Sequence, residues 1–482
     1  MTIPKEVKSI LAELKKHGYE AYVVGGCVRD LLLGKTPQDW DVTTNARPAQ
    51  IQGIFPDSFY ENIFGTVGVK IGSEDPSLDI IELTTYRIES DYSDKRHPDK
   101  IEFADKLEDD LRRRDFTINA LAMSDGGEIV DLFGGQEDLK NKIIRAVGEP
   151  SNRFNEDALR MTRAVRLATV LEFEIESKTA EVIRSQARLL GEIAQERIRD
   201  ELVKIINSPR AMQGIELLRE TGLLEFIIPE LLEGHGVGQN KHHIYTVWEH
   251  NLRALQYTAD KNYSFEVRMA SLLHDVGKPR SKRGDGPDST FYAHEIIGGK
   301  MTAKIMERLR FSRDVAEKVT HLVRSHLFYY NVGEVSAAGV RRFLSRVGPE
   351  NVDDLLKVRE ADRIGSGVPK AFPYKLRHLL FMIEKVKNDP ISPKMLKVNG
   401  QDVMKVANIE PSPKVGQILA VLLEEVLEDP TMNSIENLEL RIKELTKLSD
   451  EELIKMKQKA QEVKEEFESG VEEEMKKKFY VK

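Results

Sequence analysis

The pattern of hydrophobic and polar positions changes character about a third of the way along the chain. In the first part, short runs of β-branched and aromatic residues, such as 66–71 and 78–86, predict strands, and 107–123 predicts a helix that opens with acidic residues. Further on, hydrophobic residues recur every three or four positions, as in 156–171 and 179–206, which predicts amphipathic helices. We therefore expect an α+β protein in which a small mixed-sheet domain precedes several all-α domains.

Breaks in this pattern divide the chain into five parts. Glycines become sparse beyond residue 150, and a stretch rich in Gly and His at 234–247 interrupts the helices. The last part is so rich in charged residues that it predicts a helical extension with a solvated or self-associating surface. The expected parts are 1–150, 151–235, 236–370, 371–448 and 449–482.

Composition narrows the class of protein. The 482 residues are 40% hydrophobic and 32% charged, which is typical of a soluble globular chain without a membrane span. Cys27 is the single cysteine, so an internal disulfide is excluded, and the N-terminal region has no apolar signal core. We therefore expect a cytoplasmic protein. The net charge of −8 disfavours a strongly basic, salt-driven nucleic-acid binder, but it is compatible with a local basic groove.

A glycine turn and two carboxylates form the first candidate site. Gly25 and Gly26 follow an expected strand, where glycines let the backbone approach a phosphate that Arg29 can also bind. Asp39 and Asp41 stand two positions apart, so on a strand their side chains point to the same face. Such a pair suits Mg²⁺, and two ions can activate an attacking hydroxyl and stabilise a leaving pyrophosphate. An isolated Asp-x-Asp is more often an exposed strand edge or turn, but the glycine turn upstream favours the metal site.

Three further patterns add charged groups. Glu82 stands among apolar residues of an expected strand, where it is either a third metal ligand or a residue that faces solvent. The run Arg112–Arg114 suits a polyphosphate or a solvated helix surface. Asp157 and Arg160 lie three positions apart on an expected helix, so they are neighbours there. Together they can read the edge of a base, or they can form a surface salt bridge.

Four motifs, in this order, resemble the class II tRNA nucleotidyltransferase and bacterial poly(A) polymerase family of the DNA polymerase beta superfamily. They are GGCVRD (25–30), DWD (39–41), RRRDFTINA (112–120) and EDALRMTRAVR (156–166). The resemblance covers roughly residues 15–230. It implies a polymerase-beta-like nucleotidyltransferase head over 1–150, with catalytic Mg²⁺ on Asp39 and Asp41. It also implies a neck and body over 151–235 that select the nucleotide and bind RNA.

The same resemblance assigns roles to the nucleotide-binding residues. Asp157 and Arg160 would act as a protein template that pairs with incoming CTP or ATP, and Arg163 would orient the nucleotide. The 3′-hydroxyl of a tRNA would then attack the α-phosphate, and pyrophosphate would leave. The expected nucleotide-binding residues are Gly26, Arg29, Arg114, Asp157, Arg160, Arg163 and Arg166.

A loop bears on which nucleotides are added. Residues 85–103 look like the intact flexible loop of the family, which argues against an enzyme that adds only CC. The residues in family-like places are Arg87, Tyr92, Asp94, Arg96 and Pro98. Residues 1–22 lack the extra basic motif that poly(A) polymerases of the family usually carry. We therefore expect CCA addition to tRNA, with A-only addition or poly(A) synthesis as the alternatives.

Histidines and aspartates form the second candidate site. His274 and Asp275 are adjacent at the end of an apolar helix, and imidazole with carboxylate suits a divalent transition metal such as Mn, Fe, Ni or Co. The pattern looks like an HD-domain phosphohydrolase over 236–370. This resemblance implies four metal ligands, His250, His274, Asp275 and Asp362. His294 and His326 sit where binuclear members have extra ligands, but a single metal is the simpler expectation.

A water bound to such a metal can attack a phosphate ester, so we expect a bifunctional enzyme. The competing hypothesis, from another class, makes metal-dependent phosphohydrolysis the main activity and the head an RNA-binding module. Residues 399–438 resemble the C-terminal part of bacterial family members, which assigns 371–448 to a tRNA-binding helical tail. Ser412-Pro413 stands there in place of the usual Gly-Pro turn.

Overall fold

The computed structural model describes residues 3–62, 65–90, 100–239, 244–284, 286–328, 330–368 and 370–456. The contacts divide the chain into two compact units, each of which is described by itself below. The first unit comprises Met1–Glu233, Ala259–Phe265 and Lys304–Arg313, and the second comprises Gly234–Thr258, Glu266–Ala303 and Asp314–Lys482. No helix of the described ranges is long and apolar enough to cross a bilayer.

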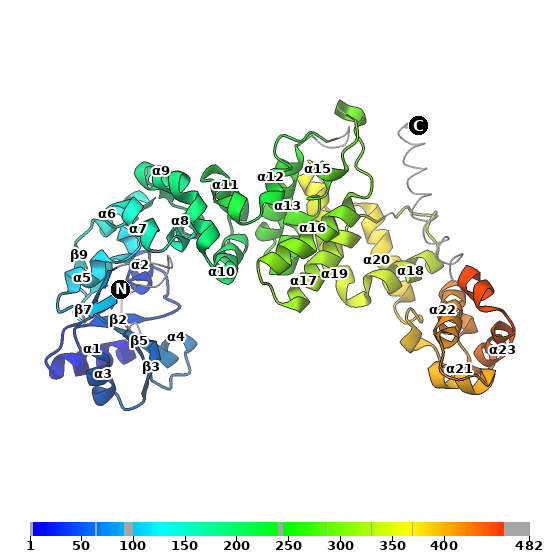
Figure 1. Cartoon of the computed structure of the whole chain (residues 1–482), viewed down its shortest axis with the longest axis horizontal. Coiled ribbons are helices and arrows are strands. Elements are labelled where there is room, and N and C mark those ends of the chain that lie inside the picture. The colour runs from blue at the N-terminus through cyan, green and yellow to red at the C-terminus, as the bar shows by residue number, and fades with distance from the viewer. Residues whose placement is uncertain are drawn as a thin grey trace. The chain divides into compact units, whose positions relative to one another are not determined.

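A seven-stranded mixed sheet forms the head of the first unit (Figure 1, blue to cyan). Its order is β3-β4-β5-β2-β1-β8-β9, and every neighbouring pair is antiparallel except β2 with β5. The strands are β1 (Ala21–Val24), β2 (Asp41–Thr44), β3 (Ser58–Asn62), β4 (Thr66–Lys70), β5 (Ile80–Thr85), β8 (Leu121–Met123) and β9 (Ile129–Asp131). The strands predicted over 66–71 and 78–86 are thus present, although the second begins with a helical turn.

Short helices and two small ladders complete the head. The helices are α1 (Lys5–Lys16), α2 (Gly26–Leu32), α3 (Pro48–Ile54), α4 (Pro76–Asp79), α5 (Leu107–Arg112), η1 (Thr117–Asn119) and α6 (Gly135–Asn141). One ladder joins β6 (Arg87–Ser90) to β7 (Lys100–Phe103), and the other joins β10 (Ile143–Ile144) to β11 (Glu174–Ile175). On one face of the main sheet, Leu111 of α5 packs with Val24 and Ala122 in a small hydrophobic cluster.

The prediction of one helix over 107–123 is wrong beyond Arg112. The Asp115 side chain accepts hydrogen bonds from the backbone N–H of Phe116 and from the side-chain amide of Asn119. Phe116 is fully buried and forms a β-bridge with Ala146. These tertiary contacts outweigh the helical periodicity of the segment, because helix propensity is a weak preference.

Helices make up the rest of the first unit's N-terminal segment. They are α7 (Pro150–Glu156), α8 (Leu159–Leu171), α9 (Ser177–Gln186), η2 (Ala187–Glu192), α10 (Gln195–Ile206), α11 (Ala211–Glu220), η3 (Leu223–Phe226) and α12 (Pro229–Leu232). α8 contacts both α10 and α11, and nine of its thirteen residues are buried. α8 is therefore the central helix of this part, which fixes the side chains on it.

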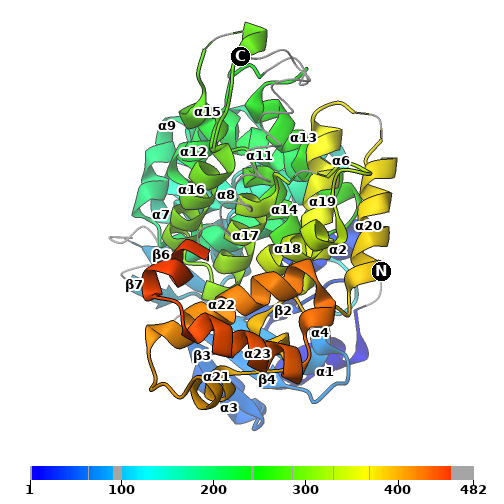
Figure 2. The same cartoon turned by 90° about the vertical axis from the view of Figure 1, so that its right-hand side faces the viewer.

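Helices dominate the region that follows. Those from 247 to 386 are α13 (Val247–Asp260), α14 (Phe265–Leu273), α15 (Lys278–Ser281), η4 (Gly286–Asp288), α16 (His294–Arg308), α17 (Arg313–Ser325), α18 (Ala337–Val347), α19 (Pro349–Gly365) and α20 (Tyr374–Val386). Those beyond 386 are η5 (Pro393–Met395), α21 (Gly400–Ala407), α22 (Pro413–Glu428), η6 (Pro430–Met432) and α23 (Ile435–Thr446). α21, α22 and α23 pack against one another around the buried Val403, Leu422 and Ile442 (Figure 2, orange and red).

Candidate nucleotide and metal sites

A glycine turn between β1 and α2 lies against two of the expected site residues. Gly25 has a φ of +85°, a conformation that residues with a side chain rarely adopt. A Cβ atom added there would lie 2.9 Å from Nη1 of Arg114 and 3.7 Å from Oδ2 of Asp41. The missing side chain at Gly25 therefore leaves room for the Arg114 guanidinium beside the Asp41 carboxylate.

The other expected residues of this turn are Gly26 and Arg29, in the first turn of α2. A Cβ atom on Gly26 would lie 3.5 Å from Nη2 of Arg29. Nη1 of Arg29 donates to Oδ1 of Asn119 at 2.7 Å, and Nη2 lies 2.8 Å from Oδ1 of Asp30. Arg29 is thus a cation held in place beside the turn, which suits the binding of a phosphate oxygen.

Asp39 and Asp41 stand on either side of a buried tryptophan. Trp40 is only 4% exposed, whereas Asp39 is exposed and Asp41 is half-buried, so neither carboxylate is enclosed in the core. The expectation that both residues stand on a strand is half right. Asp41 begins β2, whereas Asp39 is exposed in the bend that precedes it.

A third carboxylate stands beside Asp41. The parallel register of β2 and β5 pairs Asp41 with Glu82, so the two side chains share a face of the sheet. Ile81 and Leu83 on either side of Glu82 are buried, whereas Glu82 is exposed. Of the two interpretations of Glu82, a ligand or a solvent-facing residue, this register favours the ligand. Carboxylate oxygens are the ligands that Mg²⁺ prefers. Among the described residues, however, only members of the buried histidine cluster described below gather three ligand atoms within 4.8 Å of one another, so the structure does not bring Asp39, Asp41 and Glu82 together as a closed site.

Cys27 lies below these carboxylates and does not add a ligand. Its Sγ donates to the carbonyl oxygen of Val24 at 3.2 Å, and the residue is buried. Burial, together with the negative charges of Asp41 and Asp39, raises the pKa of the Cys27 thiol to about 12. The thiol therefore stays neutral, and a neutral thiol is a poor metal ligand and nucleophile.

The three arginines of 112–114 do not act as one polyphosphate-facing run. Arg112 is exposed and pairs with Glu108 one helical turn earlier. Arg113 and Arg114 both reach the fully buried Asp110, with contacts of 2.6 and 3.2 Å. Burial by itself would raise the pKa of Asp110, but the two guanidinium groups lower it below its ordinary value. Asp110 therefore stays charged, and it holds Arg114 against the glycine turn.

The expected template residues do not pair with each other. Asp157 follows α7 and lies two residues before α8, where its Oδ1 accepts the backbone N–H of Leu159 at 3.0 Å. Its Oδ2 accepts from Nη2 of Arg197, a residue of α10, at 2.9 Å. Arg160, in the first turn of α8, donates instead to the Glu156 carboxylate and to the carbonyl oxygen of Arg113. The salt bridge between Asp157 and Arg160 that the spacing allowed is absent.

The two remaining arginines of α8 are also held by carboxylates. Arg163 donates from Nε and Nη2 to Oδ2 of the buried Asp115, at 2.9 and 2.7 Å. Arg166 donates from Nε to Oε2 of Glu201 on α10 at 2.5 Å. Burial would raise the pKa of Asp115, but Arg163 and Asn119 lower it well below its ordinary value. Guanidinium groups thus line successive turns of one helix that begins beside the head.

Sequence reasoning missed Asp110 and Arg197, which hold Arg114 and Asp157. Asp110 had a readable signal, because it stands three and four positions before Arg113 and Arg114 on a helix. Arg197 had none, since it lies 40 residues from Asp157. Of the loop expected over 85–103, Tyr92, Asp94, Arg96 and Pro98 lie outside the described residues.

The second site is a buried cluster of four histidines and two aspartates. They come from α13, the end of α14, the start of α16, the residue after α17, and α19. The members are His250, His274, Asp275, His294, His326 and Asp362, all of them buried. The fold thus brings together the four expected ligands and the two histidines that were expected only in binuclear members.

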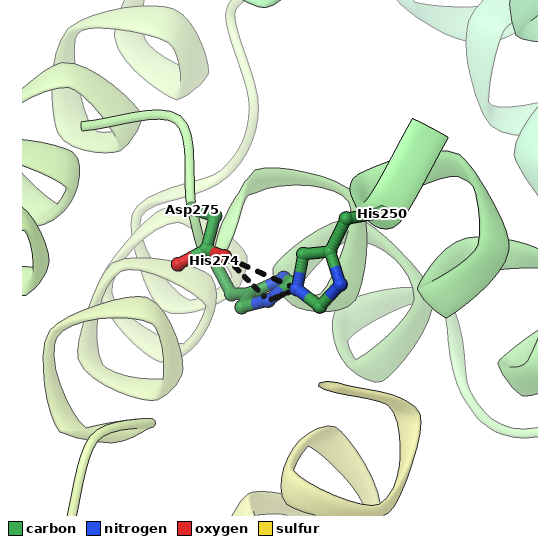
Figure 3. Close-up of side chains that lie close together, drawn as sticks. All are labelled: His250, His274 and Asp275. Carbon is green, nitrogen blue, oxygen red and sulfur yellow. Dashed lines mark hydrogen bonds and ion pairs between the residues drawn. The ribbon is translucent and has the colours of Figure 1, made fainter. Parts of the chain in front are cut away.

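Two groups within this cluster have the spacing of metal ligands, and Asp275 belongs to both. Its Oδ2 lies 3.1 Å from Nε2 of His250 and 3.3 Å from Nε2 of His274 (Figure 3). Its Oδ1 lies 3.3 Å from Nε2 of His294 and 3.7 Å from Nε2 of His326. Each oxygen of one carboxylate therefore faces its own pair of imidazoles. Oδ1 of Asp362 lies 3.4 Å from Nε2 of His250, on the first side.

Hydrogen bonds to the backbone fix the orientation of three of these imidazoles. Nδ1 of His274 lies 2.8 Å from the carbonyl oxygen of Ser271, and Nδ1 of His294 lies 2.8 Å from that of Phe291. His326 repeats the arrangement with Val323. A carbonyl can only accept, so Nδ1 carries the proton in the neutral ring and Nε2 presents its lone pair to the cluster. This donor set suits a divalent transition metal.

The aspartates and the histidines of the cluster shift the pKa values of the imidazoles in opposite directions. Burial would lower the pKa of His274, but Asp275 and Asp362 raise it to about 10. At His326, burial and the neighbouring His274 and His294 lower the pKa to about 3. The two aspartates thus favour a cation among the imidazoles, and the crowding of the imidazoles disfavours a second proton. A metal ion satisfies both conditions.

Lys278 is a buried cation at the edge of this cluster. Its Nζ lies 2.6 Å from Oδ2 of Asp275 and donates to Oε1 of Gln239 at 2.6 Å. A second cation, Arg359, pairs with Asp362. Both cations touch a carboxylate of the cluster, so both are placed to attract an anionic phosphate.

Comparisons with known proteins match three separate parts of the chain to family models. Family models match at residues 21–145 (Poly A polymerase head domain), 172–234 (Probable RNA and SrmB- binding site of polymerase A) and 247–365 (HD domain). A CCA-adding enzyme of Ligilactobacillus salivarius is 33% identical over 94% of this chain and 99% of that protein. An A-adding tRNA nucleotidyltransferase of Deinococcus radiodurans is 34% identical over 84% of this chain and 91% of that protein. Alignments to several further CCA-adding enzymes span only about half of those proteins, for example 53%.

A solved structure supports the same relationship. The Bacillus stearothermophilus CCA-adding enzyme in complex with CTP has a TM-score of 0.65 and 28% identity, and the match covers 91% of this chain and 96% of that chain. The mixed-sheet head and the helical neck therefore define a nucleotidyltransferase that carries an HD domain. The chain belongs to the tRNA nucleotidyltransferase and poly(A) polymerase family.

Proposed function

We propose that this protein completes the 3′ end of tRNA by adding CCA from CTP and ATP without a nucleic-acid template. The observation that carries the proposal is the juxtaposition of Arg114, the Gly25 turn and the Asp41 carboxylate, with Glu82 in register beside Asp41. Open backbone, a guanidinium group and metal-binding carboxylates are each suited to binding the phosphates of a nucleoside triphosphate with its Mg²⁺. The relatives named CCA-adding enzymes support the choice of nucleotides and of tRNA.

In the proposed mechanism the neck selects the base and the head performs the transfer. Asp157 and Arg160 would present an acceptor and donors to the Watson–Crick edge of CTP or ATP. Arg29 and Arg114 would bind the phosphates, and Arg163 and Arg166 would orient the nucleotide along α8. Asp39 and Asp41 would hold Mg²⁺, which supplies charge stabilisation for the pyrophosphate that leaves. The tRNA 3′-hydroxyl attacks the α-phosphate, a P–O bond forms, and the bond to pyrophosphate breaks.

The choice between full CCA addition and A-only addition has a direct test. The Deinococcus radiodurans relative is named an A-adding enzyme, so A-only addition is the alternative within the family. The protein is incubated with tRNAs that lack the last one, two or three nucleotides, with CTP alone, ATP alone and both. We expect extension of all three tRNAs to the complete CCA end when both nucleotides are present. Incorporation of ATP only, into the tRNA that lacks one nucleotide, would establish the A-adding alternative, and long A tails would establish poly(A) synthesis.

A second activity is favoured by the histidine cluster. We propose that the HD domain is a metal-dependent phosphohydrolase, with His250, His274, Asp275 and Asp362 as its ligands. Because the two carboxylate oxygens of Asp275 face different pairs of histidines, His294 and His326 are candidates for additional metal ligands. The metal would supply an activated water, and Lys278 would attract the phosphate. The test is hydrolysis of a 2′,3′-cyclic nucleotide with added Mn, Ni, Co or Fe by the parent and by His274→Ala. Hydrolysis that survives His274→Ala, or is absent with every metal, contradicts this assignment.

A further inference from the structure

One face of α20 carries a row of aromatic side chains that ends in a lysine. Tyr374, His378, Phe381 and Lys385 are spaced by four, seven and eleven positions from the first, so they share one side of the helix. Tyr374 is 60% exposed and Phe381 is 62% exposed. Soluble proteins rarely expose large aromatic residues in a contiguous row unless the row binds something. We call these four residues the Tyr374 row (Figure 1, yellow helix α20).

The rings of the row follow one another at nearly equal intervals. The ring centroids of Tyr374 and His378 are 6.0 Å apart, and those of His378 and Phe381 are 5.8 Å apart. Each pair is tilted by more than 50°, so the rings do not cover each other's faces as stacked rings do. Tyr330 supports the middle ring from behind, because its hydroxyl is hydrogen-bonded to Nδ1 of His378. The row thus places three aromatic rings in sequence along α20, and a hydrogen bond from Tyr330 holds the central ring.

The helix that carries the row is positively charged, although the chain as a whole carries −8. α20 has three Lys or Arg residues and one Glu, which gives a net charge of 3 − 1 = +2 with His378 neutral. Arg377 lies over the ring of Tyr374 at 6.0 Å, and Lys375 is exposed beside it. Aromatic faces with interleaved cations are the surface that binds single-stranded nucleic acid, since bases stack on rings and phosphates pair with cations.

A short stretch of chain connects the row with the histidine cluster. Tyr330 follows the candidate ligand His326 by four residues, a span of at most about 14 Å. Between them, Phe328 lies under the guanidinium of Arg359, which in turn pairs with Asp362 of the cluster. The same segment therefore supports the central ring of the row and supplies a ligand to the cluster.

We propose that the Tyr374 row binds the unpaired 3′-terminal nucleotides of an RNA and presents their end to the histidine cluster. The preferred substrate of the HD domain is then an RNA strand with a terminal phosphate ester, whereas a free cyclic mononucleotide is hydrolysed without contacting the row. This proposal rests on the phosphohydrolase activity proposed above. The row is proposed to bind the RNA and the cluster to hydrolyse it, so an experiment can refute the binding proposal without refuting the hydrolysis proposal, and the reverse.

The test compares a short RNA with a mononucleotide on the full chain. The RNA is a hexamer that ends in a 2′,3′-cyclic phosphate and carries 2-aminopurine, whose fluorescence is quenched on stacking; the mononucleotide is 2′,3′-cyclic AMP. The variants are Tyr374→Ala with Phe381→Ala, the ring-conserving Tyr374→Phe, and a matched control on α23, Ile435→Ala with Leu440→Ala. Ile435 and Leu440 are also large and exposed, at 51% and 62%.

We expect the Tyr374→Ala/Phe381→Ala protein to lose at least about tenfold in affinity for the hexamer, because each stacked base contributes about a factor of ten. Its KM for the hexamer rises, whereas kcat/KM for 2′,3′-cyclic AMP stays within about twofold of the parent. The Tyr374→Phe protein and the α23 control behave like the parent. A hexamer that carries 4-thiouridine near its end should crosslink to the peptide that contains α20.

Three results would overturn the proposal. The first is unchanged quenching and affinity in the double variant. The second is a crosslink found only outside α20. The third is a parent protein that self-associates through this face, which would appear as a change of oligomeric state in the double variant with unchanged RNA affinity. If the parent hydrolyses neither substrate, the phosphohydrolase assignment fails, and the binding measurement still decides whether the row binds RNA.

Discussion

At the residue scale, the head depends on side chains whose neighbours orient them. Trp40 anchors the chain between Asp39 and Asp41, because a buried indole cannot turn outward without exposing its hydrophobic surface. Asp110 holds Arg114, and Arg197 holds Asp157. We therefore expect kinetic measurements on variants to distinguish the residues proposed to contact a nucleotide, such as Arg114 and Asp157, from the residues that hold them, Asp110 and Arg197.

Asp41→Asn should lower nucleotide incorporation by about 100-fold to 1,000-fold, since it removes a charged metal ligand and with it the stabilisation of the transition state. The amide keeps the size of the side chain, so folding and tRNA affinity should be unchanged. Incorporation is measured with radiolabelled CTP on a tRNA without its 3′ end, and tRNA binding by gel shift. Incorporation at the parent rate would remove Asp41 from the catalytic site.

Arg197→Ala should loosen the choice of nucleotide. The Arg197 guanidinium fixes both oxygens of Asp157, with contacts of 3.4 and 2.9 Å, and a charge-assisted pair of this kind contributes about 1.5–3 kcal/mol. We expect the preference for CTP and ATP over UTP and GTP to fall by about tenfold. The matched control is Arg199→Ala on the same helix, where the arginine pairs with Asp200 instead. Equal selectivity in the Arg197→Ala and Arg199→Ala proteins would exclude a positioning role.

Asp115→Asn should destabilise the protein in a way that depends on pH. Its carboxyl pKa is lowered from an ordinary value of 3.8 by Arg163 and Asn119 against the effect of burial. A lowered pKa in the folded state stabilises the fold at pH values above the ordinary pKa, and this contribution is lost as the pH falls below it. The parent should therefore be more stable than Asp115→Asn by about 1–3 kcal/mol near neutral pH. Urea unfolding at several pH values measures the gap, which should narrow below pH ~4. A gap that is constant with pH contradicts the expectation.

At the element scale, the type of a helix or strand could be predicted from the sequence better than the residues at which it begins and ends. Strands at 66–71 and 78–86 and the amphipathic helices beyond 150 were readable, because their periodicity reflects which face is buried. The helix expected over 107–123 ended early, since Asp115 and Phe116 make contacts with residues far away in sequence. The two sites were readable to the extent that their residues form local motifs. The contact between Arg197 and Asp157 could not be predicted, and neither could the membership of Asp275 in two ligand groups, because both depend on how helices pack.

Gly277, two residues after Asp275, packs closely against the backbone of α16, and this contact leads to a prediction. A Cβ atom on Gly277 would lie 2.2 Å from the carbonyl oxygen of His294 and 2.5 Å from the backbone nitrogen of Gly298. Gly277→Ala must therefore push α16 away, at a cost of about 1–3 kcal/mol, and displace His294 from the cluster. Urea unfolding and metal analysis of the purified protein should show lower stability and lower metal content.

The control for this change is Gly416→Ala on α22, where an added Cβ meets nothing within 4 Å. Alanine is favoured over glycine in a helix by about 1 kcal/mol, so this variant should be as stable as the parent or more stable. If the Gly277→Ala and Gly416→Ala proteins have the same stability and metal content, the contact between α16 and the HD motif does not constrain the cluster.

At the scale of the whole molecule, the two candidate sites lie in separate compact units. Asp39, Asp41 and the α8 arginines lie in the first unit, and the complete histidine cluster lies in the second. All candidate ligands of each site belong to one unit. The activities should therefore be separable by single substitutions, within a chain that belongs to one family along nearly its entire length.

His274→Ala should abolish hydrolysis of 2′,3′-cyclic nucleotides and leave CTP incorporation within about twofold of the parent, because it removes a ligand of the second unit only. Asp41→Asn should do the reverse. Both activities are measured on the same preparations of each protein. Loss of both activities in either variant would indicate that the two units depend on each other.

The buried thiol of Cys27 has a practical consequence for experiments on this enzyme. It is the single cysteine of the chain, it is buried, and its pKa is raised to about 12, so maleimides and other thiol reagents will leave it unmodified in the native protein. The natural sequence therefore already behaves as a cysteine-free background. Cysteines introduced one per unit can carry a pair of fluorophores, and energy transfer between them would follow the distance between the units as a tRNA is extended.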